Sequence, residues 1–248
     1  MNYKSLCTEF YDLTKPMPGA LEWAFYDALL KNTKGLSLEA MCGSGRLLIP
    51  LLENGYCVEG VDNSPDMLNR CREKGLARSL SVTLYQQSLQ ELRLPKRYSL
   101  IFIPLGSFQH IREINESLII LDKLRLHLEP NGILMLETFG KQTLTLENPD
   151  KPLAFRWTAT SSKGYEIVNK SIIKNVTPEL LLNQMKYEKW ENGELKESET
   201  GEWYIKSYEQ EELCSLLHEA GFTSVKSERQ SFESNPNAIL YFASCSRN

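Results

Sequence analysis

The 248-residue sequence lacks any run of about 18 uncharged apolar residues, so no membrane-spanning helix is expected. Its first ten residues, MNYKSLCTEF, also lack the apolar stretch of a secretory signal, which predicts a cytoplasmic protein. The six cysteines form no Cys-x-x-Cys pair and stand at no metal-finger spacing from a histidine. We therefore expect reduced thiols and no metal site.

An excess of positive charge is absent as well. The chain has 28 lysines and arginines against 32 aspartates and glutamates, a net charge of −4. This balance argues against a protein that bulk charge holds to nucleic acid or to an anionic membrane, so neither partner is expected. The length allows one large domain, or one domain that carries an insertion.

Short apolar strands alternate with helix-like segments through the first 140 residues. Strands are predicted at 36–41, 56–61, 82–86, 100–105 and 133–139, and helices after Pro18 and over 46–53, 64–74 and 113–128. Pro50 should kink the second helix or shift its boundaries. The alternation resumes with a helix over 207–220, capped by Ser207 and Gln210, and with strands at 223–228 and 238–243. This pattern predicts an α/β fold whose mostly parallel seven-stranded sheet has helices on both faces.

Residues 141–206 depart from this pattern because they contain alternating strand-like segments and no convincing helix. Three of the four tryptophans lie here, and Asn192-Gly193 is a strong hairpin signal. We interpret the segment as an antiparallel β-meander inserted into a cofactor domain made of residues 1–140 and 207–248. It is expected to wall an acceptor pocket or to form a homodimer interface.

The chemistry is predicted in two neighbouring stretches, LEAMCGSGRLLIP (38–50) and VEGVDNSPDML (58–68). Gly43 and Gly45 follow one strand and let a ligand approach the backbone closely. Asp62 ends the next strand, where its carboxylate can bind both hydroxyls of a ribose. Alternatively, Asp62 only caps the helix that begins at Pro65. Leu48 stands where a dinucleotide fingerprint needs its third glycine, and no Gly-Lys-Ser/Thr follows, which favours a nucleoside without a pyrophosphate.

These stretches resemble motif I and the following acidic loop of the Rossmann-like (class I) S-adenosylmethionine-dependent methyltransferases, with Met41 in place of the first glycine. The segments 84–88, 97–101, 128–132 and 219–222 extend the resemblance over nearly the whole chain, although Ser88 and Ser99 replace the usual acids. The resemblance implies S-adenosylmethionine as cofactor, S-adenosylhomocysteine as product, and no metal. The inserted meander is similar to that of small-molecule N-methyltransferases acting on amino sugars or glycine-type amines.

The resemblance also implies a set of binding residues. The cofactor residues are Glu39, Met41, Gly43, Ser44, Gly45, Arg46, Asp62, Asn63, Met67, Gln87, Ser88, Leu89, Pro104 and Leu105. Glu39 reaches the methionyl amine in this assignment, residues 43–45 lie under the methionine moiety, and residues 87–89 form the adenine edge. Residues 104 and 105 offer backbone carbonyls to the amino group. Arg46 either pairs with the cofactor carboxylate or is a solvated helix residue.

Two candidate catalytic residues follow from position. Tyr11 lies in an N-terminal segment that covers the cofactor in similar enzymes, and His110 lies just past the fourth strand. His110 is a candidate general base, or else a hydrogen-bonded loop histidine. The favoured function is methylation of a small molecule, at an amine nitrogen. The alternatives are a S-adenosylmethionine-binding module without turnover and a protein or RNA methyltransferase.

Overall fold

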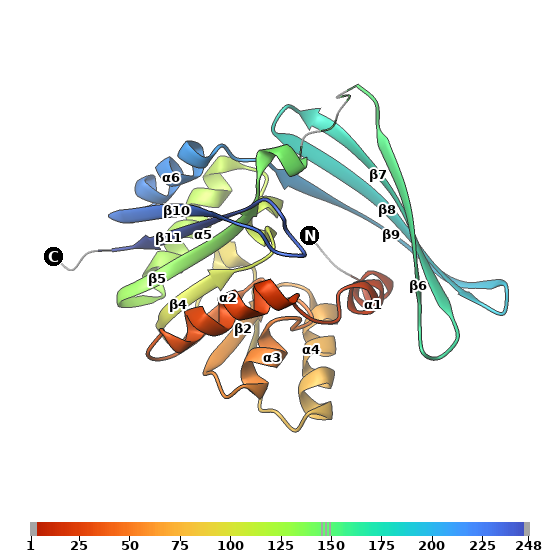
Figure 1. The fold of residues 1–248 in the computed structure, drawn as a ribbon, viewed down its shortest axis with the longest axis horizontal. Helices are drawn as coiled ribbons and strands as arrows, with labels where there is room; N and C mark the ends of the chain where they lie inside the picture. Colours follow the sequence, from red (N-terminus) through yellow and green to blue (C-terminus); the bar gives the residue numbers. More distant parts are fainter. Residues whose placement is uncertain (1–3, 145, 147, 149, 246–248) are drawn as a thin grey trace.

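The chain folds into two sheets with a helix between them. A computed structural model describes residues 4–144, 146, 148 and 150–245. Figure 1 shows a large sheet and a small sheet on either side of α1 (Ser5–Thr14). The predicted domain limits include residues 1–3, 145, 147, 149 and 246–248, which lie outside the described residues. No helix within the described part of the chain is both long and apolar enough to cross a membrane.

The large sheet has seven strands in the order β10-β11-β5-β4-β1-β2-β3. They are β1 (Ser37–Ala40), β2 (Val58–Asp62), β3 (Leu84–Gln86), β4 (Tyr98–Ile103), β5 (Leu128–Phe139), β10 (Ser224–Gln230) and β11 (Ala238–Ser244). β11 runs antiparallel to both of its neighbours, whereas the other pairs are parallel. The predicted mostly parallel, seven-stranded sheet is thereby confirmed.

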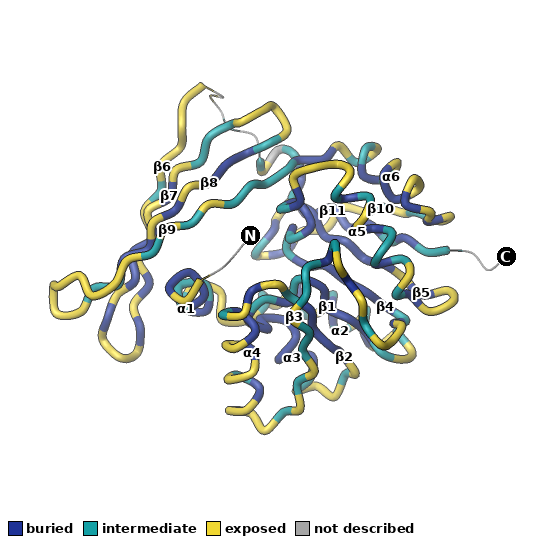
Figure 2. The backbone as a smooth tube through the Cα atoms, turned by 180° about the vertical axis from the view of Figure 1, so that it is seen from behind, coloured by how far each residue is buried: buried dark blue, intermediate teal, exposed yellow. Residues whose placement is uncertain are grey.

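Helices cover both faces of this sheet. They are α2 (Ala20–Lys31), α3 (Leu48–Glu53), α4 (Pro65–Ala77), α5 (Ile114–Leu126) and α6 (Gln210–Glu219), with short 3₁₀ turns η1 (Leu89–Glu91), η2 (Ser107–His110) and η3 (Lys141–Leu144). Two separate apolar clusters form the core. One joins the sheet to α5 and α6, and the other joins it to α2, α3 and α4. Figure 2 shows the resulting band of buried residues along the central strands.

The boundaries of α3 and α4 differ from the prediction. α3 begins at Leu48, which places Pro50 in the first turn, where its missing N–H costs nothing. α4 is capped by Ser64 as predicted, but it continues through Gly75, where a Cβ atom would lie 2.3 Å from Val82. Gly75 therefore permits close packing and does not end the helix.

The predicted cap of α6 is wrong. Glu209 caps this helix together with Glu212, in a reciprocal capping box. The Ser207 hydroxyl instead donates a hydrogen bond to the carbonyl of Glu179, in the turn between two strands of the small sheet. Because its hydroxyl is bonded to this distant residue, Ser207 does not cap the helix.

The small sheet consists of β6 (Leu153–Thr160), β7 (Glu166–Thr177), β8 (Leu180–Glu191) and β9 (Glu194–Lys206), all paired antiparallel. Asn192 and Gly193 have φ angles of 52° and 77°, as expected for the predicted hairpin. The α1 helix was not predicted from the sequence. This helix packs Leu6 and Cys7 against Met185 and Tyr187 of β8, so α1 bridges the two sheets.

Candidate active site

A cavity lies at the carboxyl ends of β1, β2 and β4, which are adjacent in the sheet. In open α/β sheets this edge is where ligands bind. Thirteen of the sixteen predicted site residues line it, namely Tyr11, Glu39, Met41, Gly43, Arg46, Asp62, Asn63, Met67, Gln87, Leu89, Pro104, Leu105 and His110. Ser44, Gly45 and Ser88 do not.

The turn after β1 adopts the backbone conformation that glycine favours at three positions. Met41, Gly43 and Gly45 have φ angles of 61°, 53° and 76°. Met41 stands where the resembled motif has its first glycine, so this residue holds a left-handed conformation that is unusual for a side chain of its size. A Cβ atom on Gly43 would meet only the Met67 sulfur, at 3.7 Å. The backbone at Gly43 is therefore open to a ligand.

Asp62 connects this turn to the second strand. Its Oδ2 accepts a hydrogen bond from the Gly43 N–H at 2.9 Å, and its Oδ1 accepts one from the Ser64 N–H at 2.8 Å. Ser64, and not Asp62, caps α4. The backbone of Asn63 donates a third hydrogen bond to this carboxylate, which has about four acceptor sites, so Asp62 keeps some capacity to accept from a ligand hydroxyl. Burial raises the pKa of Asp62, and its backbone hydrogen bonds oppose that shift.

Glu39 presents a buried carboxyl group to the same cavity. It is 2% exposed, and its Oε2 has no hydrogen-bond partner among the described residues. Burial raises the pKa of Glu39 to about 8, despite the opposing effect of the nearby Arg46. A buried carboxylate oxygen without a donor is costly. A ligand with an ammonium group would supply that donor, so Glu39 fits the methionyl amine of S-adenosylmethionine.

Arg46 lines the cavity, but it already pairs with an acid of the protein. Its guanidinium is buried and binds both carboxylate oxygens of Glu22, at 2.8 and 2.5 Å. It is therefore no solvated helix residue, and most of its charge is neutralised within the protein. Arg46 also interacts with Tyr11, whose pKa burial raises and Arg46 lowers. This buried group supports the end of the cavity that Glu39 lines.

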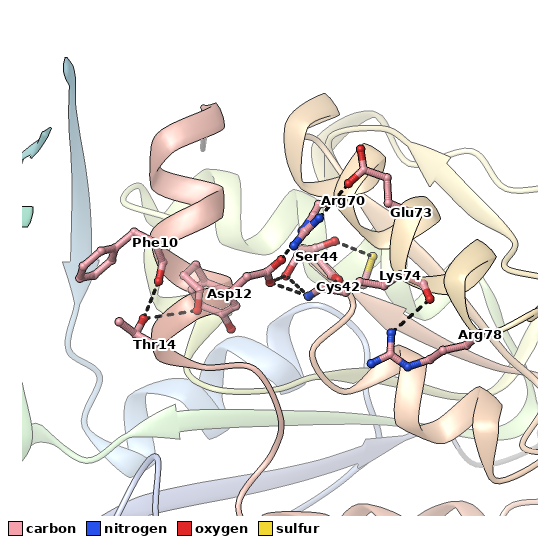
Figure 3. Close-up of polar contacts among 11 residues, drawn as sticks. Phe10, Asp12, Thr14, Cys42, Ser44, Arg70, Glu73, Lys74 and Arg78 are labelled. Atoms are coloured by element: carbon pink, nitrogen blue, oxygen red, sulfur yellow. Dashed lines mark hydrogen bonds and ion pairs between the residues drawn. The ribbon is translucent and has the colours of Figure 1, made fainter. Parts of the chain in front are cut away.

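Ser44 and Gly45 belong to the turn but do not line the cavity. Figure 3 shows Asp12 of α1 pointing toward Ser44, Arg70 and Lys74. The Ser44 hydroxyl donates to Asp12 at 2.7 Å, and Arg70 and Lys74 donate to the same carboxylate at 2.7 and 2.5 Å. Ser44 thus faces α1 and not the cavity, which corrects its prediction. The hydrogen bonds of this buried carboxylate hold α1 against the glycine turn.

Gly45 is a packing position. A Cβ atom there would lie 2.5 Å from the sulfur of Cys71 and 3.0 Å from Ile49. The turn can therefore approach α4 only because residue 45 has no side chain. Gly45 does not line the cavity, so its place under the methionine moiety stays a prediction.

The predicted adenine edge is only partly as expected. Gln87 lines the cavity, but its amide is bonded to the backbone N–H and carbonyl of Arg93. Ser88 precedes η1 and lies outside the cavity wall. Leu89 does line the cavity. This loop therefore presents apolar side chains and backbone groups to the cavity, because the polar side chain of Gln87 is already hydrogen-bonded.

The loop after β4 is held by a buried acid. The carbonyl of Pro104 accepts from Ser107 N and Oγ, which leaves Leu105 as the better source of a carbonyl for the cofactor amine. Leu105 has a φ of 54°, and its N–H donates to Glu137 Oε2 at 2.9 Å. Glu137 is fully buried at the end of β5 and also accepts from Tyr26. This acid fixes the strained turn that leads into η2.

His110, at the end of η2, lines the cavity with a defined tautomer. Its Nδ1 lies 2.9 Å from the carbonyl oxygen of Tyr204, which can only accept, so Nδ1 carries the hydrogen. Burial lowers the pKa of His110, so the imidazole is neutral and Nε2 keeps its lone pair. The ring packs edge-on against Trp203 with centroids 5.2 Å apart. His110 is thus both a positioned residue and a competent proton acceptor.

Sequence reasoning missed several residues of the cavity wall. They are Cys42, Val61, Gln90, Ser107, Ile111, Glu116 and Ile120. Glu116 and Ile120 stand four residues apart on α5, a spacing that places them on one helix face. That spacing, beside a helix that follows the fourth strand, is the signal that could have found them.

Comparison with known proteins agrees with this geometry. Residues 38–132 match a family model described as a methyltransferase domain. A dTDP-3-amino-3,6-dideoxy-alpha-D-glucopyranose N,N-dimethyltransferase from Streptomyces fradiae is 28% identical over 142 residues, which cover 55% of this chain and 54% of that one. The chain spans at most 62% of the length of the curated relatives that it first matches.

Solved structures are similar over almost the full length. The sugar N-methyltransferase KedS8 from Streptoalloteichus has a TM-score of 0.75 at 15% identity, with 96% of this chain and 92% of that chain covered. CalS10, an amino pentose methyltransferase from Micromonospora echinaspora solved with S-adenosylmethionine bound, has a TM-score of 0.69 at 14% identity, with 97% of each chain covered.

The fold and the matched segment define a methyltransferase domain. Residues 38–132 match this domain, and the fold of the chain is that of the class I, Rossmann-like, S-adenosylmethionine-dependent methyltransferases, as the resemblance of the glycine turn and Asp62 predicted.

Proposed function

We propose that this chain is an enzyme that transfers a methyl group from S-adenosylmethionine to a nitrogen of a small-molecule amine. The observation that carries the proposal is the unpartnered carboxylate oxygen of Glu39, in the same cavity as the Nε2 atom of His110. Glu39 would hold an ammonium group, whereas His110 would accept a proton. One cavity therefore combines a site for the cofactor with a base for the acceptor.

The residues present fit the cofactor. Glu39 and the carbonyl of Leu105 would hold its amino group, the open backbone at Gly43 would lie along its methionine moiety, and Asp62 would bind the ribose hydroxyls. When bound, S-adenosylmethionine supplies a methyl group already activated by a sulfonium. The protein therefore has mainly to align the acceptor, a contribution that can reach about 7–11 kcal/mol of the barrier.

His110 handles the proton in this proposal. A neutral amine that gains a methyl group must release a proton, and His110 Nε2 takes it. The carbonyl of Tyr204 stabilises the imidazolium that results, because Nδ1–H remains bonded to it. Tyr11, of α1, lines the same cavity, whereas Trp203, of β9, packs against the His110 ring. The aromatic face of Tyr11 suits a cationic group near the reacting nitrogen.

Methylation at nitrogen is favoured by the proteins that this chain is similar to. The names of the Streptomyces fradiae relative and of KedS8 both specify N-methylation, and in both the substrate is a sugar. Other relatives are ubiquinone biosynthesis O-methyltransferases, with 42% of the chain matched. The acceptor class that we propose is therefore a small amine, and the hydroxyl is the alternative to exclude.

The edge of the small sheet carries an exposed aromatic pair. Phe155 and Trp157 stack at 4.9 Å on β6, an edge strand, and Trp157 is 48% exposed. We propose that this edge forms a homodimer contact in a cytoplasmic enzyme. Sedimentation of the wild type and of Trp157→Ala tests this, because loss of the aromatic pair should shift a dimer toward monomer.

The direct test of function is a screen with methyl-labelled S-adenosylmethionine. Amine, hydroxyl and carboxylate metabolites are offered separately, and labelled products are identified by mass. Label should appear on amines. Label on hydroxyls alone would overturn the assignment to nitrogen. Tight binding of S-adenosylmethionine with no labelled product from any class would favour the binding module without turnover, and label on protein or RNA would favour the third alternative.

A further inference from the structure

The two ends of the cavity differ in chemistry. Glu39, Arg46 and Tyr11 make one end charged and polar. The side chains of Leu89, Ile111 and Ile120 line the cavity near η1 and α5, and they belong to the apolar core of the large sheet. A ligand that fills the cavity must therefore carry a charged group at one end and a flat or compact apolar group at the other.

Two polar side chains interrupt this apolar end. Gln90 of η1 and Glu116 of the first turn of α5 both line the cavity, and the Gln90 amide donates a hydrogen bond to Glu116 Oε1. Glu116 makes no other hydrogen bond within the described part of the chain, so its Oε2 is available to a donor from a ligand. Gln90 therefore fixes the orientation of a carboxylate that faces into an apolar slot.

A carboxylate in this position selects a ligand with an N–H donor on its edge. Adenine presents apolar faces and a 6-amino donor, which match the leucine and isoleucine side chains and the Glu116 oxygen respectively. A purine with a 6-oxo group has an acceptor there instead, and it would oppose a carboxylate with a second electron-rich oxygen. Ser88, where the resembled family has an acid, lies outside the cavity and cannot supply this contact.

We propose that Glu116, oriented by Gln90, recognises the 6-amino group of the cofactor's adenine. This inference rests on the proposed function, since it assumes that the cavity holds S-adenosylmethionine. It assigns adenine recognition to α5, and not to the loop after β3. The pair is a specificity determinant, because it distinguishes adenosine from inosine at the edge of the base.

The test compares two ligands in four proteins. S-adenosylhomocysteine and its 6-oxo analogue, S-inosylhomocysteine, are titrated calorimetrically into the wild type, Glu116→Ala, Glu116→Gln and Glu113→Gln. Glu113 precedes α5 without a side-chain capping bond, lies outside the cavity wall and pairs with Arg112, so its substitution is the matched control. The readout is the ratio of the two affinities within each protein, which does not change if part of a sample is unfolded.

The wild type should bind the adenine compound at least about tenfold more tightly than the 6-oxo compound. Glu116→Ala should lower that ratio by about tenfold, and Glu116→Gln should lower it further, because an amide can also donate to the 6-oxo group. Glu113→Gln should keep the wild-type ratio. An unchanged ratio in both Glu116 variants would overturn the inference while leaving the proposed function intact, whereas failure of the wild type to bind either compound would overturn the proposed function itself.

Discussion

Asp62 accepts a hydrogen bond of 2.9 Å from the backbone N–H of Gly43, so the acid at the end of β2 holds the glycine turn that follows β1. The two features that predicted a nucleoside site are thus one hydrogen-bonded unit. The same carboxylate accepts from the N–H of Ser64, the residue that caps α4. Loss of Asp62 should therefore disturb the turn as well as any ribose contact.

The two glycines of this turn should respond differently to substitution. Gly43→Ala should cost about 1–2 kcal/mol, because the left-handed conformation is strained but space is open. Gly45→Ala should cost about 1–3 kcal/mol more, because the new Cβ would meet Cys71 at 2.5 Å. Urea denaturation of both variants measures the difference. Equal losses would show that the contact with Cys71 does not limit residue 45.

The buried pair of Glu22 and Arg46 should be essential for stability. Glu22→Gln should lower the free energy of unfolding by about 3–5 kcal/mol, because it leaves a buried guanidinium without a counter-charge. Glu194→Gln, which breaks an exposed pair with Lys196, should cost less than about 1 kcal/mol. Urea unfolding compares the two variants. A small effect at Glu22 would mean that water reaches Arg46.

Glu39 should make the ligand-free protein less stable as the pH rises. Its folded-state pKa of about 8 exceeds the ordinary value of 4.5, so between these values the folded state binds more protons than the unfolded state. Stability from this group is present at low pH and is lost as the pH rises toward 8. The Tm of Glu39→Gln minus the Tm of the wild type should therefore increase as the pH rises from about 5 to about 8.5. A constant difference in Tm would place the carboxyl in contact with water.

His110 should control turnover and leave cofactor affinity nearly unchanged. Once the acceptor is identified, His110→Ala should lower kcat by about 10²–10⁴-fold while the affinity for S-adenosylhomocysteine stays within about threefold. Burial lowers the pKa of His110, so the wild-type rate should fall only below about pH 6.5, as the imidazole gains a proton.

The matched control for His110 is His218→Gln. His218 bonds through Nδ1 to the carbonyl of Phe222 in the same way, but it lies outside the cavity wall. This variant should retain full turnover. Wild-type turnover in His110→Ala would instead assign His110 to the structural role of a bonded loop histidine.

The sequence was informative where local signals dominate. Strand periodicity, the glycines and the Ser64 cap placed Glu39, Gly43 and Asp62 at neighbouring strand ends, and the structure brings them together. The same signals predicted the seven-stranded sheet and the antiparallel meander, because alternation and hairpin turns are properties of short segments.

Contacts between distant segments account for what was missed. The α1 helix is stabilised by Glu199 of β9, which accepts from the N–H groups of Leu6 and Cys7, more than 190 residues away. Ser44 and Arg46 were predicted to contact the ligand. In the structure they donate hydrogen bonds to Asp12 and Glu22, which lie on the first two helices. Spacing within one segment carries no information about such partners, so these roles could come only from the fold.

The most direct test of the account is a calorimetric titration of S-adenosylmethionine into the wild type and into Asp62→Ala, with the Tm of each measured beforehand. The wild type should bind one molecule per chain, and Asp62→Ala should bind more weakly by about 2–4 kcal/mol, since two charge-assisted hydrogen bonds are lost. No binding by the wild type, or equal affinity in a folded Asp62→Ala, would contradict the assignment of this cavity to the cofactor.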